Sequence, residues 1–91
     1  MKLEIRFGRT KSLRLPEAVR QAEKIPGYSK QDRGREVEVA VSTMVPFDDP
    51  ELWHRIEELL ATVRPWKSTQ VLLDGNTVTP WQFTNDFSPV L

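Results

Sequence analysis

The chain has 91 residues, of which 13 are basic and 13 are acidic, so its formal net charge is zero. Hydrophobic residues make up 38% of it and charged residues 29%, which excludes a low-complexity polymer or a wholly disordered chain and is typical of one small globular domain. The sequence contains no cysteine, which excludes disulfide bonds and thiolate metal sites. A hydrophobic core must therefore supply the stability of the domain.

The first residues, from Met1 to Arg6, alternate between charged and apolar side chains and contain no continuous apolar run. A signal peptide needs such a run, and a membrane-spanning helix needs about 20 apolar residues. We therefore expect a cytoplasmic protein that has no membrane among its partners.

Two patterns in the first third of the chain predict a strand followed by a helix. Charged and apolar side chains alternate over residues 2–8, which predicts a half-buried strand that ends at a glycine. Apolar residues recur at helical spacing over residues 15–25, with a proline in the first turn and a Pro-Gly pair as the stop. The polar residues 27–35 that follow are bounded by glycines, so an exposed loop is predicted there.

The rest of the chain predicts a strand, a helix and a β-hairpin. Valine alternates with other side chains over residues 36–42, which is the clearest strand pattern in the chain. A helix is predicted between the Asp-Asp-Pro run at residues 48–50, which suits a helix N-terminus, and Pro65. Residues 69–73 and 77–79 predict two strands joined by a turn of Asp, Gly and Asn.

These elements predict an α+β two-layer sandwich with the order β-α-β-α-β-β. Right-handed crossover connections place both helices on one face of a mostly parallel, four-stranded mixed sheet, and they leave the other face polar and open. The last strand can run on as far as Phe83. Residues 1–84 are thus expected to form a single domain, and residues 85–91 a loosely held C-terminal tail.

The sequence contains no recognisable motif for catalysis or metal binding. His54 is the only histidine, so a metal site would need it together with Glu57 or Glu58, and a solvated helix surface is the favoured interpretation. Asp48 and Asp49 lie where a helix dipole favours ionised carboxylates, so they are interpreted as capping residues and not as an acid–base pair. No catalytic residue, metal or cofactor is therefore predicted.

Basic and acidic residues are unevenly distributed along the chain. Residues 1–35 hold ten basic and four acidic side chains, and residues 36–91 hold three basic and nine acidic ones, so the two parts carry +6 and −6. The favoured interpretation is that the fold interleaves the two parts and the charges compensate locally. The alternative is a site for an anion or a nucleic acid on the loop after the first strand and on the helix that follows. Its candidate residues are Arg9, Lys11, Arg14 and Arg20.

Aromatic residues late in the chain form the second candidate surface. Trp53 lies on the apolar face of a predicted helix and is assigned to the core. An aromatic, proline-flanked C-terminal segment can either pack on its own domain or dock on a partner, since exposed aromatic side chains often mark an interface. The candidate interface residues are Trp66, Trp81, Phe83 and Phe87.

The sequence favours a small non-enzymatic interaction module that acts through protein contacts. An open sheet edge adds the option of strand pairing between two copies, so a homodimer is one expected form. Binding of a nucleic acid or another anion by the basic loop is the alternative. A small enzyme whose site is assembled only by the fold is the second alternative.

Overall fold

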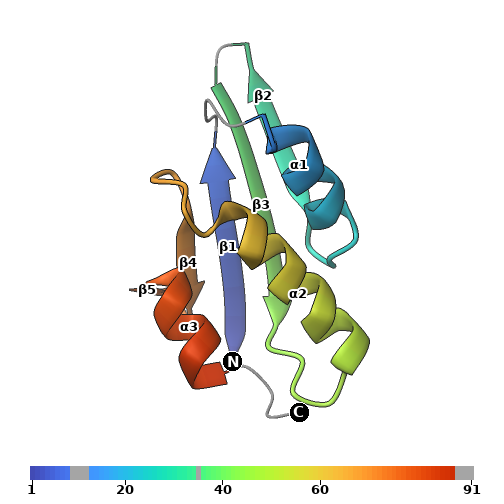
Figure 1. Ribbon diagram of the computed structural model, residues 1–91, viewed down its shortest axis with the longest axis vertical. Coiled ribbons are helices and arrows are strands. Elements are labelled where there is room, and N and C mark those ends of the chain that lie inside the picture. Colours follow the sequence, from blue (N-terminus) through green and yellow to red (C-terminus); the bar gives the residue numbers. More distant parts are fainter. Residues whose placement is uncertain (9–12, 35, 88–91) are drawn as a thin grey trace.

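The computed structural model describes residues 1–8, 13–34 and 36–87, which form one sheet and three helices (Figure 1). The strands are β1 (Lys2–Gly8), β2 (Ser29–Arg33), β3 (Glu36–Met44), β4 (Gln70–Leu73) and β5 (Asn76–Val78). The helices are α1 (Leu15–Glu23), α2 (Pro50–Val63) and α3 (Pro80–Phe87). The predicted class, α+β, is confirmed. None of the helices in the described ranges has the length and apolar character needed to cross a membrane.

All neighbouring strands of the five-stranded sheet are antiparallel, so the prediction of a mostly parallel, four-stranded sheet is wrong. The strands lie in the order β2-β3-β1-β4-β5, with β1 in the middle. β1 and β2 run in the same direction, but β3 returns between them and is antiparallel to both. The part from β1 to β4 thus has the split-βαβ arrangement of ferredoxin-like domains.

The segment predicted as an exposed loop, residues 27–35, contains the edge strand β2. Its sequence, Ser-Lys-Gln-Asp-Arg, has no apolar side chain that would reveal a buried face, and the side chains of residues 29–32 are all exposed. The strand forms because its backbone pairs with β3. An added strand at this point reverses the chain direction before β3, which turns the predicted parallel arrangement into an antiparallel one.

Helix α3 replaces the strand extension predicted toward Phe83. Thr79 caps the helix, because its Oγ1 accepts a hydrogen bond from the backbone N–H of Gln82 at 3.0 Å. Pro80 suits the first turn, where its missing N–H would have no partner in any case. The helix spans the predicted border between residues 84 and 85. Residues 88–91 lie outside the described part of the chain, so the loosely held tail stays a prediction.

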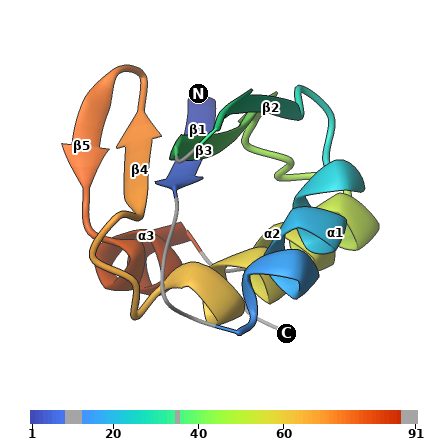
Figure 2. The same ribbon diagram turned by 90° about the horizontal axis from the view of Figure 1, so that it is seen from above.

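The molecule has two layers, because all three helices cover the same face of the sheet (Figure 2). The sequence predicts two helices on this face, and this prediction is wrong because the structure has three. The additional helix, α3, lies under the β4 end of the sheet, beside α2. A continuous hydrophobic core fills the space between the layers. Its largest fully buried side chains are Phe7, Phe83, Leu3, Ile5, Ile56, Leu59 and Leu60.

The start of α2 is built from the local contacts that its sequence predicts. Asp49 is the N-cap residue, and its Oδ1 accepts a hydrogen bond from the backbone N–H of Leu52 at 3.1 Å. The carboxylate of Glu51 lies 2.7 Å from Arg55 Nη2, one helical turn away. Trp53 is buried, as predicted. The capping role predicted for Asp49 and the core position predicted for Trp53 are confirmed.

Candidate functional site

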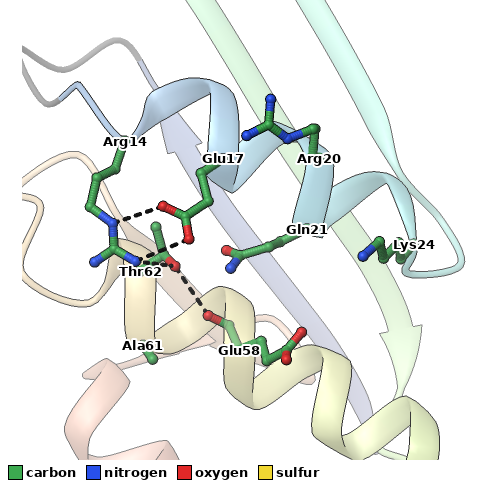
Figure 3. Close-up of a pocket in the computed structure, with 8 residues that line it drawn as sticks. All are labelled: Arg14, Glu17, Arg20, Gln21, Lys24, Glu58, Ala61 and Thr62. Atoms are coloured by element: carbon green, nitrogen blue, oxygen red, sulfur yellow. Dashed lines mark hydrogen bonds and ion pairs between the residues drawn. The ribbon is translucent and has the colours of Figure 1, made fainter.

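Two of the four basic residues predicted to bind an anion, Arg14 and Arg20, line a groove between α1 and α2 (Figure 3). The groove is a hollow of about 460 Å³. Its lining residues are Arg14, Glu17, Arg20, Gln21, Lys24, Glu58, Ala61 and Thr62. The other two residues of the predicted site, Arg9 and Lys11, lie outside the described residues.

Arg14 is engaged by an acidic neighbour on its own helix. Its Nε donates a hydrogen bond to Glu17 Oε2 at 2.9 Å, and its Nη2 donates to Glu17 Oε1 at 3.3 Å. Nη2 also donates to Thr62 Oγ1 of α2 at 3.4 Å. The hydrogen bond to Glu17 raises the pKa of Arg14, and the same hydrogen bond lowers the pKa of Glu17. The guanidinium thus ties the start of α1 to α2, and its charge is compensated where it lies.

The three cationic groups of the groove do not converge on one point. Figure 3 shows Arg14 reaching toward α2, Arg20 pointing away from α2 and Lys24 at the far end of α1. Two carboxylates, those of Glu17 and Glu58, line the same groove. An anion is held best by several donors aimed at the same place. The described residues do not provide such a place, so an anion site stays a prediction that depends on the loop after β1.

His54, the only histidine of the chain, lies on the exposed side of α2. Its side chain is 70% exposed, and its Nε2 lies 3.3 Å from Glu58 Oε1. Within the described ranges, no group of three or more His, Cys, Asp or Glu side chains lies close enough together to hold a metal ion. His54 therefore lies on a solvated helix surface beside an acidic neighbour.

The open face of the sheet is polar, and one carboxylate on β1 pairs with two cations of the same strand. The carboxylate of Glu4 lies 3.4 Å from Lys2 Nζ and 2.9 Å from Arg6 Nη2, so these charges pair within one strand and not across strands. Over the described strands, no aromatic residue lies on this face. Sheets that bind single-stranded nucleic acids stack the bases on aromatic side chains. The described strands of this face therefore offer no aromatic side chain on which a base could stack.

A different surface combines an exposed aromatic ring with a cation. Trp81, in the first turn of α3, is 60% exposed. Arg64, the C-cap residue of α2, places its guanidinium carbon 4.2 Å from the centre of the Trp81 ring. This contact is a cation–π interaction, which favours this arrangement of the two side chains by about 0.5–1 kcal/mol at an exposed site. We call these two residues the Trp81–Arg64 surface.

The other aromatic residues predicted for an interface have different positions. Trp66 is partly buried and packs edge-on against Phe7, with ring centroids 5.8 Å apart. Phe83 is 1% exposed and belongs to the core. A strand would present Trp81 and Phe83 on one face, whereas a helix turns two such residues to nearly opposite sides, at about 100° per residue. The side chain of Phe87 lies outside the described part.

Arg64 is the residue of this surface that sequence reasoning does not find. Its contact with Trp81 joins two helices that are separated by the β4–β5 hairpin. No spacing rule links such positions, and α3 itself is not predicted from the sequence. The only sequence signal is that Arg64 is a basic residue just before Pro65. A cation is common near a helix C-terminus because it interacts favourably with the helix dipole, so this signal does not indicate a contact with Trp81.

This chain matches no known protein family model, no curated protein and no solved structure. A function can therefore be inferred only from the geometry of its own surfaces. Among the surfaces of the described residues, the Trp81–Arg64 surface pairs an exposed large apolar ring with a cation that lies over it.

Proposed function

We propose that the chain is a small non-enzymatic interaction domain that binds a protein partner through the Trp81–Arg64 surface. The observation that carries this proposal is the exposure of Trp81, 60% of which is open to solvent. An indole ring presents a large apolar area, and covering it with a partner removes that area from water. Contact with a partner is therefore favourable at this position.

The arrangement of the surface also lowers the cost of binding. Trp and Arg are among the residue types that are enriched at the energetic centre of interfaces. Because the Arg64 guanidinium lies over the Trp81 ring at 4.2 Å, the contact favours one arrangement of the two side chains before a partner arrives, and less conformational entropy is lost on binding. Phe83 anchors α3 in the core, which gives the exposed ring a fixed support.

The nucleic-acid alternative has weaker support. The charge of Arg14 is compensated by Glu17, and Lys2 and Arg6 of β1 both pair with Glu4. A nucleic-acid surface depends on cations that neutralise phosphates, and on aromatic platforms when the strand is single. We therefore propose that the chain binds a protein partner at the Trp81–Arg64 surface rather than a nucleic acid.

The proposal is tested by using the whole chain as bait in an extract of its own cells and comparing the captured proteins between variants. Trp81→Ala removes the exposed ring, and we expect it to abolish capture of the specific partner. Arg64→Lys keeps the charge but loses the planar group that stacks on the ring, so a clear reduction is expected. Circular dichroism of each variant verifies that the fold persists.

Phe47→Ala is the matched control for this experiment. Phe47 lies in the connection between β3 and α2 and is 71% exposed, so its removal changes a comparable apolar area elsewhere on the molecule. We expect this variant to capture the same partner as the original chain. If Trp81→Ala captures the same proteins in the same amounts, the Trp81–Arg64 surface is not the binding site.

A further inference from the structure

The outer side of the edge strand β2 is open to another strand. Over the described residues, β2 pairs with β3 on one side and with no strand on the other. Figure 2 shows it at the end of the sheet opposite to β5. The side chains of residues 29–32 are all exposed. Such an edge presents backbone N–H and C=O groups that a further strand can pair with.

The sequence of β2 is complementary in charge to a second copy of itself. When two copies run antiparallel and the pairing is centred on Gln31, Lys30 of each copy lies opposite Asp32 of the other. Unlike charges directly opposite each other stabilise an antiparallel pair. The contact occurs twice, because a two-fold axis relates the two copies.

The same charges disfavour β2–β2 pairings that are shifted to a neighbouring register. A pairing centred on Lys30 places the two lysines opposite each other, and a pairing centred on Asp32 does the same with the two carboxylates. Charges on an edge strand normally discourage added strands. Here their order discourages these registers and favours the one centred on Gln31.

The fold places both charged side chains where these contacts need them. Lys30 lies opposite Val39 and Asp32 opposite Val37 in the β2–β3 register, so both belong to the helix-covered face and are exposed at its rim. Asp32 Oδ1 accepts a hydrogen bond from the backbone N–H of Gly34 at 3.2 Å, which orients the carboxylate. With the two-fold axis perpendicular to the sheet, the two sheets continue into one, and the helices of both copies lie on the same side.

We propose that two copies of the chain form a dimer by antiparallel pairing of their β2 strands, centred on Gln31. This inference goes beyond the partner binding proposed above, because it concerns a different surface. The Trp81–Arg64 surface lies where the C-terminal end of α2 meets α3, which lies under β4, whereas β2 is at the opposite end of the sheet from β5. The two proposals can therefore fail independently.

A cysteine cross-link tests the register directly, because the natural sequence has no cysteine. In the proposed dimer, residue 31 lies opposite its own copy, with Cβ atoms about 5 Å apart, close to disulfide geometry. Mild oxidation of Gln31→Cys is expected to give a covalent dimer. Ser29→Cys is the matched control, because residues 29 of the two copies are offset by about 13 Å along the strands, and no cross-link is expected.

A charge exchange tests the ion pairs. Lys30→Asp places two carboxylates opposite each other at both contacts, and we expect the dimer dissociation constant to rise by about tenfold or more in sedimentation equilibrium. Asp32→Lys is expected to weaken the dimer in the same way. An equimolar mixture of the two variants restores both Lys–Asp contacts and is expected to form a heterodimer as stable as the original dimer.

Three results would overturn the proposal. The first is a chain that remains monomeric up to millimolar concentration. The second is cross-linking of Ser29→Cys as efficient as that of Gln31→Cys. The third is a mixture of Lys30→Asp and Asp32→Lys that associates no better than either variant alone. Should Asp32→Lys fail to fold because the hydrogen bond to Gly34 is lost, the cysteine pair still decides the question. Trp81→Ala is expected to leave the dimer unchanged.

Discussion

At the scale of single residues, the path of the chain from α1 into β2 depends on Gly27. Its φ is +80°, a conformation that side chains other than glycine rarely adopt. A Cβ at this position would also collide with the carbonyl oxygen of Ser42 and lie 2.8 Å from its carbonyl carbon. Both atoms are backbone atoms of β3, which cannot move without disturbing the sheet. Gly27 therefore allows a close approach that no larger residue allows.

We expect Gly27→Ala to be strongly destabilising. Gly75→Ala is the matched control, because Gly75 also has a positive φ, +83°, but has no atom within 4 Å of an added Cβ. The control carries only the backbone strain, about 1–2 kcal/mol, whereas Gly27→Ala adds overpacking of about 1–3 kcal/mol. Urea denaturation followed by circular dichroism measures both. Equal losses of the free energy of unfolding would contradict this account of Gly27.

At the scale of secondary-structure elements, α3 completes the core. Phe83 packs against Trp53 of α2, with ring centroids 5.6 Å apart, and is 1% exposed. The helix thus contributes an aromatic side chain to a core that the strands and the other two helices leave incomplete. Its amphipathic character also explains why Trp81 on the same helix faces solvent.

A chain that ends after Thr79 is expected to be less stable by about 3–5 kcal/mol, the usual cost of removing a buried phenylalanine side chain. A chain that ends after Phe87 keeps every element of the described fold and is the matched control. Thermal unfolding of both against the full chain measures the difference. Equal melting temperatures for the two truncated chains would show that α3 does not stabilise the core.

At the scale of the whole molecule, the sheet interleaves the basic and acidic parts of the chain. β1 comes from the basic part and lies between β3 and β4 of the acidic part, and α1 packs against α2. The two parts thus alternate over β2, β3, β1 and β4. The ion pairs between described residues, however, each join two residues of the same part, so local compensation between the two parts stays a prediction.

The same strand order determines where the fold opens last. Residues 3–6 of β1 have strand partners on both sides, whereas β5 is a three-residue edge strand with a partner on one side. Amide hydrogen exchange followed by NMR should therefore be slowest in β1 and fast in β5. Protection of β5 equal to that of β1 would contradict this order. In the proposed dimer, protection of β2 should also increase with protein concentration.

Elements with a clear local pattern could be predicted from the sequence. The alternation of residues 2–8 and 36–42 marks strands that are buried on one face, and it is readable because each face repeats every second residue. Asp49 marks the start of α2 for a similar reason, since its hydrogen-bond partner lies only three residues away. The sequence thus determined the α+β class, most of the elements and the burial of Trp53.

Only the tertiary structure decided the direction of the strands, the presence of β2 and α3, and the contact between Arg64 and Trp81. β2 has no apolar side chain and forms through backbone pairing with β3, so its side chains carry no sign of it. Phe83 is buried because it lies on the side of α3 that faces the core, where α3 packs under β4. Trp81, two residues away, lies on the opposite side of the same helix and is exposed. The alternation and capping patterns of a sequence act over short distances in the chain, whereas strand order and the two proposed surfaces depend on segments that meet only after folding.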